Sequence, residues 1–319
     1  MEGLDTVGVW VLQKLLLRMR NEGHTVVMRG WSTRFSRLLD LVSRHEPMSV
    51  QVAPKQGLQE RTGRWSAEVW EQTLALLSFI GEIAAALAVS VAHPARIRWR
   101  PVLHNIRSAG FDALPIIGLL SFLMGIVIAY QAADQLRQYG ANIFVADLVG
   151  LSMLREFAPL MTAIIVAGRS GSAYAAQIGT MAVTEEIDAM RTIGIVPIEL
   201  LVLPKILALV IVLPLLTLFA DVLGVLGGMI MASAQLAVGF ADFLDRFVKA
   251  VSVTAYMLGL GKAPVFAAII AVVGCFQGLR TKGGADSVGR QTTRSVVQSI
   301  FLVIVADALF SVLFSILGI

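Results

Sequence analysis

The chain has 319 residues, of which 56% are hydrophobic and 15% charged, and its mean hydropathy is +0.76. About a quarter of the residues of a soluble domain are charged, so the composition excludes an ordinary soluble protein and indicates a surface that mostly faces lipid. The single cysteine excludes a disulfide framework, and four scattered histidines argue against a zinc site.

The net charge of +4 is concentrated in the first third of the chain. Residues 1–110 hold 14 Lys and Arg against 9 acids, and the remainder holds 12 against 13. A basic segment ahead of an apolar body indicates a cytoplasmic face beside anionic lipid. The first residues lack the basic and apolar regions of a cleavable signal peptide, so none is expected.

Residues 1–48 have the pattern of a small part of an α/β domain. Apolar residues recur at helical spacing over 7–19, residues 25–28 are strand-like, and Ser32 is placed to cap a second helix. Because one strand alone cannot form a sheet, we expect this segment to belong to a domain whose earlier strands are missing from the sequence. Residues 49–65, rich in Gln, Pro, Gly and charge, are the expected linker.

Residues 66–93 form the first long apolar segment. Its part from Thr73 to His93 carries one charge and is long enough to cross a bilayer. Basic residues flank it on both sides, so a spanning helix would place one basic group outside the cell, against the positive-inside tendency. We therefore expect an interfacial helix that lies in the inner leaflet, with a spanning helix as the alternative.

Five membrane spans are expected to follow the interfacial helix. The segment 280–294 is basic, and a cytoplasmic N-terminus with five crossings places it on the cytoplasmic side. The expected fold class is therefore an all-α integral membrane protein, preceded by a partial α/β segment. The expected spans are about 111–133, 143–168, 200–233, 253–279 and 295–318.

A polar elbow, residues 182–196, connects the second and third of these spans. It carries acids and an arginine on one side of a short helix and apolar residues at i, i+4 and i+7 on the other, which is the pattern of a helix docked on a surface. A solvated helix face is the alternative. The residues expected to bind a cytoplasmic partner are Val183, Glu185, Glu186, Ile187, Asp188, Met190 and Arg191.

Ionisable residues within the spans are costly unless they pair or face water. Arg155 and Glu156 are adjacent and point about 100° apart on a helix, so they either pair with other helices or line a polar cavity. The same two alternatives apply to four further residues: Asp147, Asp221, Lys262 and Asp307.

No catalytic motif is present. Residues 259–262 lack P-loop spacing, and the small-residue segment 168–173 has no following lysine. Small side chains in a bilayer favour close helix packing, which we expect of Gly168, Gly171 and Ala173. The chain is therefore not expected to be an enzyme or to bind a cofactor or metal.

Several motifs in order resemble the MlaE/YrbE-type permeases, the membrane subunits of bacterial ABC transporters that move phospholipids or related lipids between the inner and outer membranes. The resemblance covers about residues 65–319 and rests on these segments: Leu154–Pro159, Ala167–Ala173, Ile178–Met181, Thr184–Met190 and Gly289–Gln298.

The resemblance implies an interfacial helix, five spans and a permease homodimer in the bacterial inner membrane. It also implies a separate ABC ATPase dimer that binds ATP and Mg²⁺, a periplasmic MCE-domain ring, and a role in outer-membrane lipid asymmetry. The elbow 182–196 would be the coupling helix seated in a groove of the ATPase. Lipid would occupy a cavity at the dimer interface, with Arg155 and Glu156 at its wall or floor.

Residues 1–48 resemble the latter half of a STAS domain. The resemblance rests on Leu4–Gly8 and Thr25–Gly30, and Asp5 and Thr6 match the position of the contact or regulatory Ser/Thr of such domains. It implies a STAS-like segment fused to the permease, whereas in related systems this domain is a separate subunit bound to the ATPase.

The function expected from these features is that of a non-catalytic permease subunit with a cytoplasmic N-terminus. One alternative is an ion-coupled secondary transporter with Arg155, Glu156 and Asp221 as relay groups, although five spans without an internal repeat argue against it. The other alternative is a membrane scaffold that recruits a soluble partner through the elbow.

Overall fold

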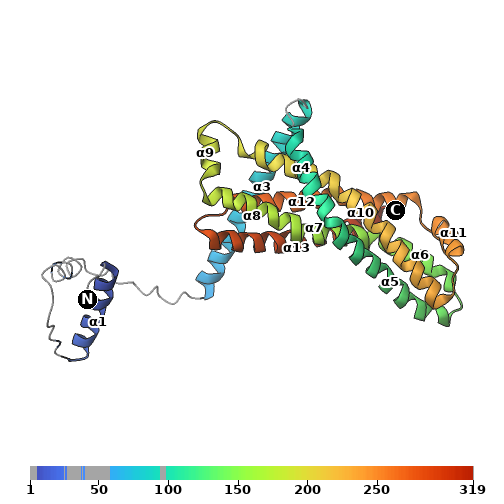
Figure 1. Cartoon of the computed structure of the whole chain (residues 1–319), viewed down its shortest axis with the longest axis horizontal. Coiled ribbons are helices and arrows are strands. Elements are labelled where there is room, and N and C mark those ends of the chain that lie inside the picture. The colour runs from blue at the N-terminus through green and yellow to red at the C-terminus, as the bar shows by residue number, and fades with distance from the viewer. Residues whose placement is uncertain are drawn as a thin grey trace. The chain divides into compact units, whose positions relative to one another are not determined.

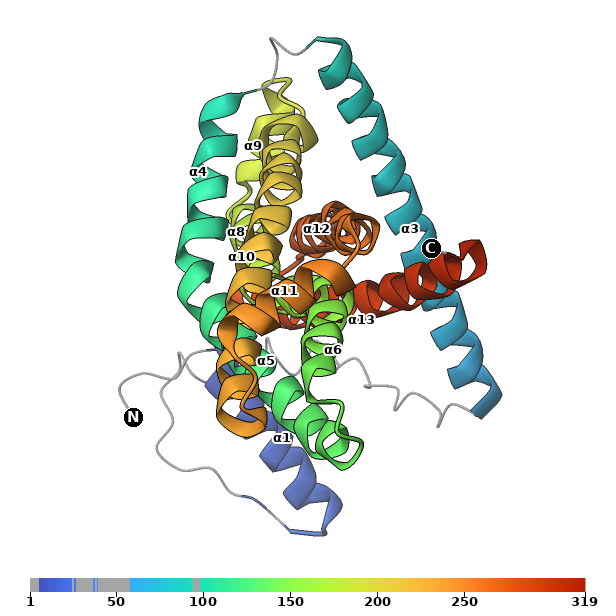
Figure 2. The same ribbon diagram turned by 90° about the vertical axis from the view of Figure 1, so that its right-hand side faces the viewer.

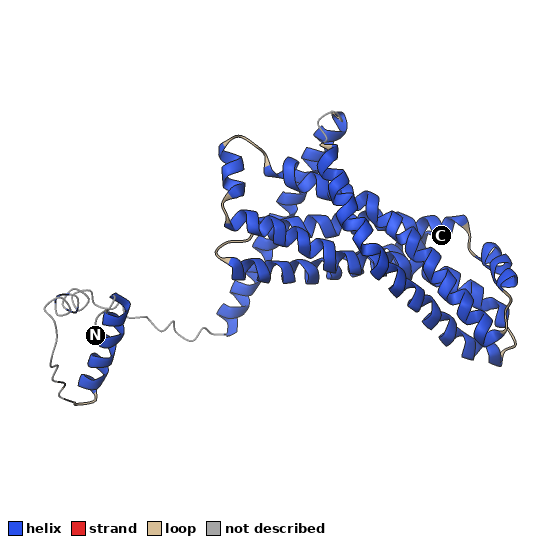
Figure 3. Ribbon diagram, in the orientation of Figure 1, coloured by secondary structure: helices blue, strands red, loops and turns tan. Residues whose placement is uncertain are grey.

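The structure is a computed structural model that describes residues 6–24, 26, 37, 39, 58–93 and 98–318. Within these residues every regular element is a helix (Figure 3). The helices before the elbow are α1 (Thr6–Asn21), α3 (Leu58–Ala92), α4 (Trp99–Gly110), η2 (Phe111–Ala113), α5 (Leu114–Gln138), η3 (Asn142–Phe144), α6 (Val145–Ser152), η4 (Met153–Phe157), α7 (Ala158–Val166), η5 (Ala167–Gly171) and α8 (Ser172–Val183). The remaining helices are α9 (Glu186–Thr192), η6 (Ile198–Val202), α10 (Leu203–Leu236), α11 (Phe240–Ala250), α12 (Val253–Leu279) and α13 (Ala285–Leu317).

The chain divides into two units, Met1–Glu71 and Gln72–Ile319. In the first unit, α1 begins at Thr6. The expected strand at 25–28 lies largely outside the described residues, and Asp5 lies outside them entirely. The STAS-like character of this unit therefore stays a prediction.

The second unit is a bundle of long apolar helices with α12 at its core (Figure 1). Helix α12 packs against α8, α10 and α13, and 56% of its most apolar 18-residue window is buried. Helix α13 packs against α12 and α8 along one side only, and just 6% of its corresponding window is buried. The bundle therefore exposes a broad apolar surface, as a protein solvated by lipid does.

Glycines allow α5 and α10 to pack with their backbones in contact. A Cβ atom added at Gly125 would collide with the carbonyl oxygen of Gly224, and one at Gly227 would collide with that of Phe122. Without a hydrophobic force between helices in lipid, such close contact is a main source of helix association.

The helices extend further than the expected spans. Residues 142–183 form one continuous helical stretch, although the second span was expected to end near residue 168. The π-helical segment η5 carries the chain through the small residues, where Gly171 is buried against Ile270 of α12. Packing thus offsets the helix-breaking tendency of glycine. Helix α13 likewise begins at residue 285 rather than near 295.

Six described helical segments are long and apolar enough to cross a membrane, one more than the five expected spans. The additional segment is Trp70–Ser90, within α3. Figure 2 shows α12 nearly end-on but α3 along its side, and Figure 1 likewise shows α3 crossing the direction of α12 and α13. Residues 72–92 of α3 therefore run across the bundle, with Phe79 packed on Phe276 at 5.6 Å between ring centroids.

Two amphipathic helices were not anticipated from the sequence. Helix α4 precedes α5 and packs on α10, and α11 connects α10 to α12. Figure 1 shows α11 at the opposite end of the bundle from α9. Helix α11 is attached to α6 by Arg246, which binds both carboxylate oxygens of Asp147 at 2.7 and 2.5 Å. This hydrogen-bonded pairing raises the pKa of Arg246.

Candidate functional site

A charge cluster lies inside the bundle, where η4, α12 and α13 meet. The Lys262 Nζ atom donates to Glu156 Oε2 at 2.7 Å and to Asp307 Oδ1 at 2.9 Å. The Ser311 hydroxyl donates to Glu156 Oε1 at 3.1 Å, and Arg155 Nε lies 3.7 Å from the same oxygen. The structure therefore brings Arg155 and Glu156 together with two residues whose partners the sequence left open.

The position of Lys262 depends on a close approach of α12 to η4. A Cβ atom at Gly259, three residues before Lys262, would collide with the carbonyl oxygen of Leu154. The approach occurs at a π-helical segment, a local widening of the helix that is frequent at functional sites. Gly259 and η4 thus place the ammonium group within reach of Glu156.

The cluster balances its charges. Two carboxylates, one ammonium and one guanidinium sum to zero, which lowers the cost of keeping ionised groups in an apolar interior. The Lys262 side chain is fully buried, whereas 34% of the Glu156 side chain and 28% of the Arg155 side chain are exposed. The cluster therefore presents an anion and a cation on one side while its lysine stays enclosed.

The other two ionisable residues expected within the spans, Asp147 and Asp221, lie outside this cluster. Asp147 forms the ion pair with Arg246. Asp221 on α10 is 4% exposed, and its enclosed Oδ1 atom has no hydrogen-bond partner among the described residues. Asp221 is not part of the charge cluster as the structure shows it.

The polar elbow contains a shorter helix than expected. Helix α8 ends at Val183, and α9 spans only Glu186–Thr192. Glu185 adopts a left-handed φ of 61°, which turns the chain sharply between the two helices. Val183 is thus not on the same helix as Ile187, and the expected i, i+4, i+7 face is wrong in this respect.

The elbow still presents one apolar and one polar side. Ile187 is buried and Met190 is half-buried against the chain. The charged residues are all exposed, and Arg191 donates to Asp188 Oδ1 at 3.2 Å. Thr184 donates to Glu186 Oε1 at 2.9 Å. The elbow therefore exposes a polar surface on a helix held by its apolar side.

A buried lysine connects the two helices that lead into and out of the elbow. Lys205 of α10 donates to Gln177 Oε1 of α8 at 2.6 Å, and its Nζ lies 4.7 Å from the centre of the Tyr174 ring. Lys205 is 5% exposed. We call Lys205 and Gln177 the elbow brace. The sequence offered only a lone lysine near a span end as a signal, and the contact was not predicted.

The three small residues expected to pack differ in the structure. Gly171 is buried, and its carbonyl oxygen is 3.5 Å from the Ser295 hydroxyl of α13. Gly168 and Ala173 are exposed, and a Cβ atom at Gly168 would meet nothing within 4 Å. Close helix packing at Gly168 and Ala173 therefore stays a prediction.

Neither a metal site nor a reactive thiol stands out among the described residues. No group of three or more His, Cys, Asp or Glu side chains there is arranged to hold a metal ion. Cys275 is free and fully buried.

Long apolar helices around an internal charge cluster define a multi-pass membrane protein with an exposed polar elbow. The sequence profile of the family described as Permease MlaE matches residues 102–313. The chain is 34% identical over 255 residues to a probable ABC transporter permease protein of Synechocystis, covering 80% of this chain and 95% of that protein.

Further relatives agree with this match. The chain is 33% identical over 249 residues to a probable ABC transporter permease protein of Rickettsia bellii, covering 77% of this chain and 96% of that protein. It is 31% identical over 264 residues to protein TRIGALACTOSYLDIACYLGLYCEROL 1, chloroplastic, of Arabidopsis thaliana, covering 82% of this chain and 74% of that protein. The chain belongs to the MlaE family of ABC transporter permeases.

Proposed function

We propose that this chain is the permease subunit of an ABC transporter that moves phospholipid or a related lipid between the inner and outer membranes of a bacterium. A permease of this type works with an ATPase partner, which would bind ATP and Mg²⁺. The lipid class is supported by one relative, which is named for the galactolipid trigalactosyldiacylglycerol.

The elbow is the observation that carries this proposal. Its polar residues are exposed on a short helix whose two flanking helices are joined by Lys205 and Gln177. A force applied to α9 would therefore reach α8 and α10 together. Such a stiff connection suits a transporter in which a partner's motion shifts packed helices between two arrangements.

The charge cluster is proposed to line or support the lipid cavity. Arg155 and Glu156 expose part of their side chains and so offer a cation and an anion to a polar head group. We place this cavity between two copies of the chain, with a periplasmic MCE-domain protein above. Lys262 and Asp307 would hold Glu156 in position by the contacts described.

The membrane placement is also part of the proposal. A cytoplasmic N-terminus puts α9 on the cytoplasmic side, where an ATPase is found, and α11 on the other side. The crossing of α3 over the bundle direction supports an interfacial helix rather than a sixth span. Residues 1–48 would be a STAS-like segment on the cytoplasmic side.

The proposal is tested by copurification from the native host in mild detergent. We expect an ABC ATPase to accompany the tagged chain and the complex to hydrolyse ATP. Glu186→Arg should reduce both, because it reverses a charge on the exposed side of α9. The matched control is Asp134→Arg, which reverses an exposed acid at the outer end of α5.

Two outcomes would count against the coupling assignment. One is wild-type ATPase recovery and activity in the Glu186→Arg variant. The other is a chain that purifies without any ATPase and still transports its substrate, which would support the ion-coupled alternative.

A further inference from the structure

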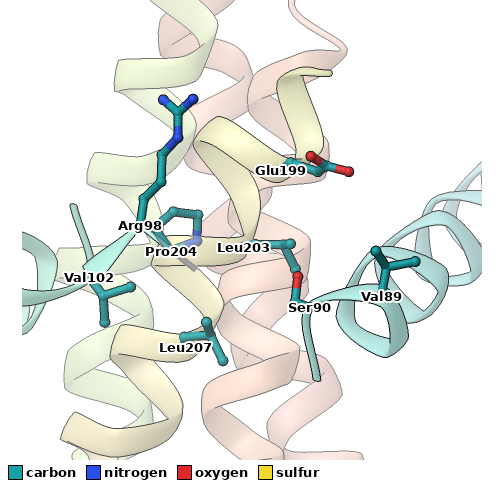
Figure 4. Close-up of a pocket in the computed structure, with 8 residues that line it drawn as sticks. All are labelled: Val89, Ser90, Arg98, Val102, Glu199, Leu203, Pro204 and Leu207. Atoms are coloured by element: carbon teal, nitrogen blue, oxygen red, sulfur yellow. The ribbon is translucent and has the colours of Figure 1, made fainter. Parts of the chain in front are cut away.

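A small pocket lies away from the charge cluster, where α3, α4 and the start of α10 meet (Figure 4). Figure 4 shows that three helical segments contribute: α3 on one side, α4 on the other, and the η6–α10 segment between them. The lining residues are Val89, Ser90, Arg98, Val102, Glu199, Leu203, Pro204 and Leu207.

The pocket combines an apolar floor with two opposite charges. Val102 and Leu203 are almost fully buried. Arg98 and Glu199 are exposed, and Figure 4 shows the Arg98 side chain above Pro204 and the Glu199 carboxylate nearer the side of α3. Among the residues that the structure describes, neither forms an ion pair or side-chain hydrogen bond. An unpaired cation and anion above one apolar floor are suited to a ligand that carries both charges and an apolar part.

The surroundings indicate that the ligand comes from the bilayer. Trp99, next to Arg98, is 55% exposed, and tryptophan is enriched where membrane meets water. Arg100 and Arg107 are exposed on the same helix. The apolar segment of α3 runs into the pocket and keeps most of its side chains exposed, with 11% of its most apolar window buried. The pocket thus lies at a lipid–water boundary.

We infer that the pocket binds a zwitterionic glycerophospholipid whose head group carries a phosphate and a primary amine. The phosphate accepts from the Arg98 guanidinium, a strong charge-assisted contact. The ammonium group donates to the Glu199 carboxylate, and the first part of an acyl chain covers Leu203 and Leu207. This inference requires only that the chain lies in a membrane and is independent of the proposed transport.

Glu199 gives the pocket its expected selectivity. An anionic head group without an amine would still contact Arg98 through its phosphate. It would have no ammonium group to balance the Glu199 carboxylate, so the phosphate and the carboxylate would repel each other. The Ser90 hydroxyl donates to the Ala86 carbonyl oxygen at 2.8 Å, so its own oxygen remains free to accept from an amine. Phosphatidylethanolamine should therefore bind more tightly than phosphatidylglycerol.

The experiment is native mass spectrometry of the full chain, purified with the subunits that accompany it and titrated with each of the two lipids. In the wild type we expect phosphatidylethanolamine to bind at least about fivefold more tightly. Arg98→Gln should weaken both lipids by about tenfold. Glu199→Gln should remove the preference between them. Arg100→Gln, an exposed neighbour outside the pocket, is the matched control and should change neither.

Two variants that each add a bulky side chain distinguish binding in this pocket from nonspecific lipid binding. Leu207→Trp fills the pocket and should abolish the selective binding, whereas Ile211→Trp, one turn further along α10 and 43% exposed, should leave it intact. Equal binding of both lipids to the wild type would overturn the inference. So would equal effects of the Leu207 and Ile211 variants, or of the Arg98 and Arg100 variants.

Discussion

Lys262 illustrates how a single residue within a span can organise its neighbours. Its ammonium group is enclosed, and it contacts carboxylates from two other helices. The sequence indicated that Lys262, Glu156 and Asp307 needed partners, because unpaired charges in hydrocarbon are costly. It did not show that they are partners of one another, since this depends on the approach of α12 to η4 at Gly259.

Lys262→Met is expected to destabilise the chain strongly. The substitution leaves the Asp307 carboxylate without its ammonium partner, and Arg155 compensates Glu156 only partly from 3.7 Å. Breaking a buried ion pair by removing one partner costs about 3–5 kcal/mol. Thermal unfolding in detergent, followed by the loss of helical circular dichroism, measures the destabilisation.

The control for this prediction is the neutral triple variant Lys262→Met, Glu156→Gln, Asp307→Asn. Most of the lost thermal stability should return, because no unpaired charge remains. A single Lys262→Met variant that unfolds at the wild-type temperature would show that the cluster contributes nothing to stability.

Unlike Lys262→Met, Asp221→Asn is not expected to lower the stability of the chain. Its carboxylate is buried without a hydrogen bond to its enclosed oxygen among the described residues, so Asp221→Asn removes no hydrogen bond among them. The unfolding temperature should stay the same or rise, with a free-energy gain of at most about 1–3 kcal/mol. A clear loss of stability in the same circular-dichroism assay would reveal a partner for Asp221 outside the described residues or in a second subunit.

At the scale of elements, the elbow depends on the helices that hold it. The charged residues of 185–191 and the flanking apolar runs predicted a helix exposed to water, and α9 confirms that such a helix exists. The turn at Glu185 was not predictable, because left-handed φ values are rare for a residue other than glycine. The elbow brace was not predictable either, because it joins residues 28 positions apart in sequence.

Removing the brace is expected to uncouple the elbow from the bundle. Lys205→Met keeps the apolar length of the side chain but loses the hydrogen bond to Gln177. The ATPase should still copurify, because α9 keeps its exposed residues, while the amount of lipid moved per ATP should fall about fivefold or more. Lys249→Met, an exposed lysine on α11, is the matched control. An unchanged ratio of transport to hydrolysis would exclude this role for the brace.

Close helix contact is the second feature at this scale. The sequence did not indicate that Gly125 and Gly224 meet, yet these two glycines let α5 and α10 touch. Gly125→Val should prevent this contact and lower the thermal unfolding temperature, by an overpacking cost of about 1–3 kcal/mol. Gly261→Val, at a glycine with no neighbour within 4 Å in α12, is the control and should have a much smaller effect.

At the scale of the whole molecule, composition and hydropathy were sufficient to predict an all-helical membrane protein with an N-terminal apolar helix. The cytoplasmic placement of the elbow stays a prediction. The fold class is confirmed by the described helices and the family by the profile match. Helices α4 and α11 were missed because each is short and amphipathic beside much longer apolar runs. Which helices pair depends on side-chain fit, and hydropathy does not record that.

The central claim is that ATP hydrolysis by a partner drives lipid movement through this permease. It is tested most directly by transfer of a fluorescent phospholipid in proteoliposomes that contain the purified complex. We predict transfer that requires ATP and that is lost in Glu186→Arg while Asp134→Arg behaves as the wild type. Transfer without ATP, driven by a proton gradient across liposomes containing this chain alone, would contradict the account.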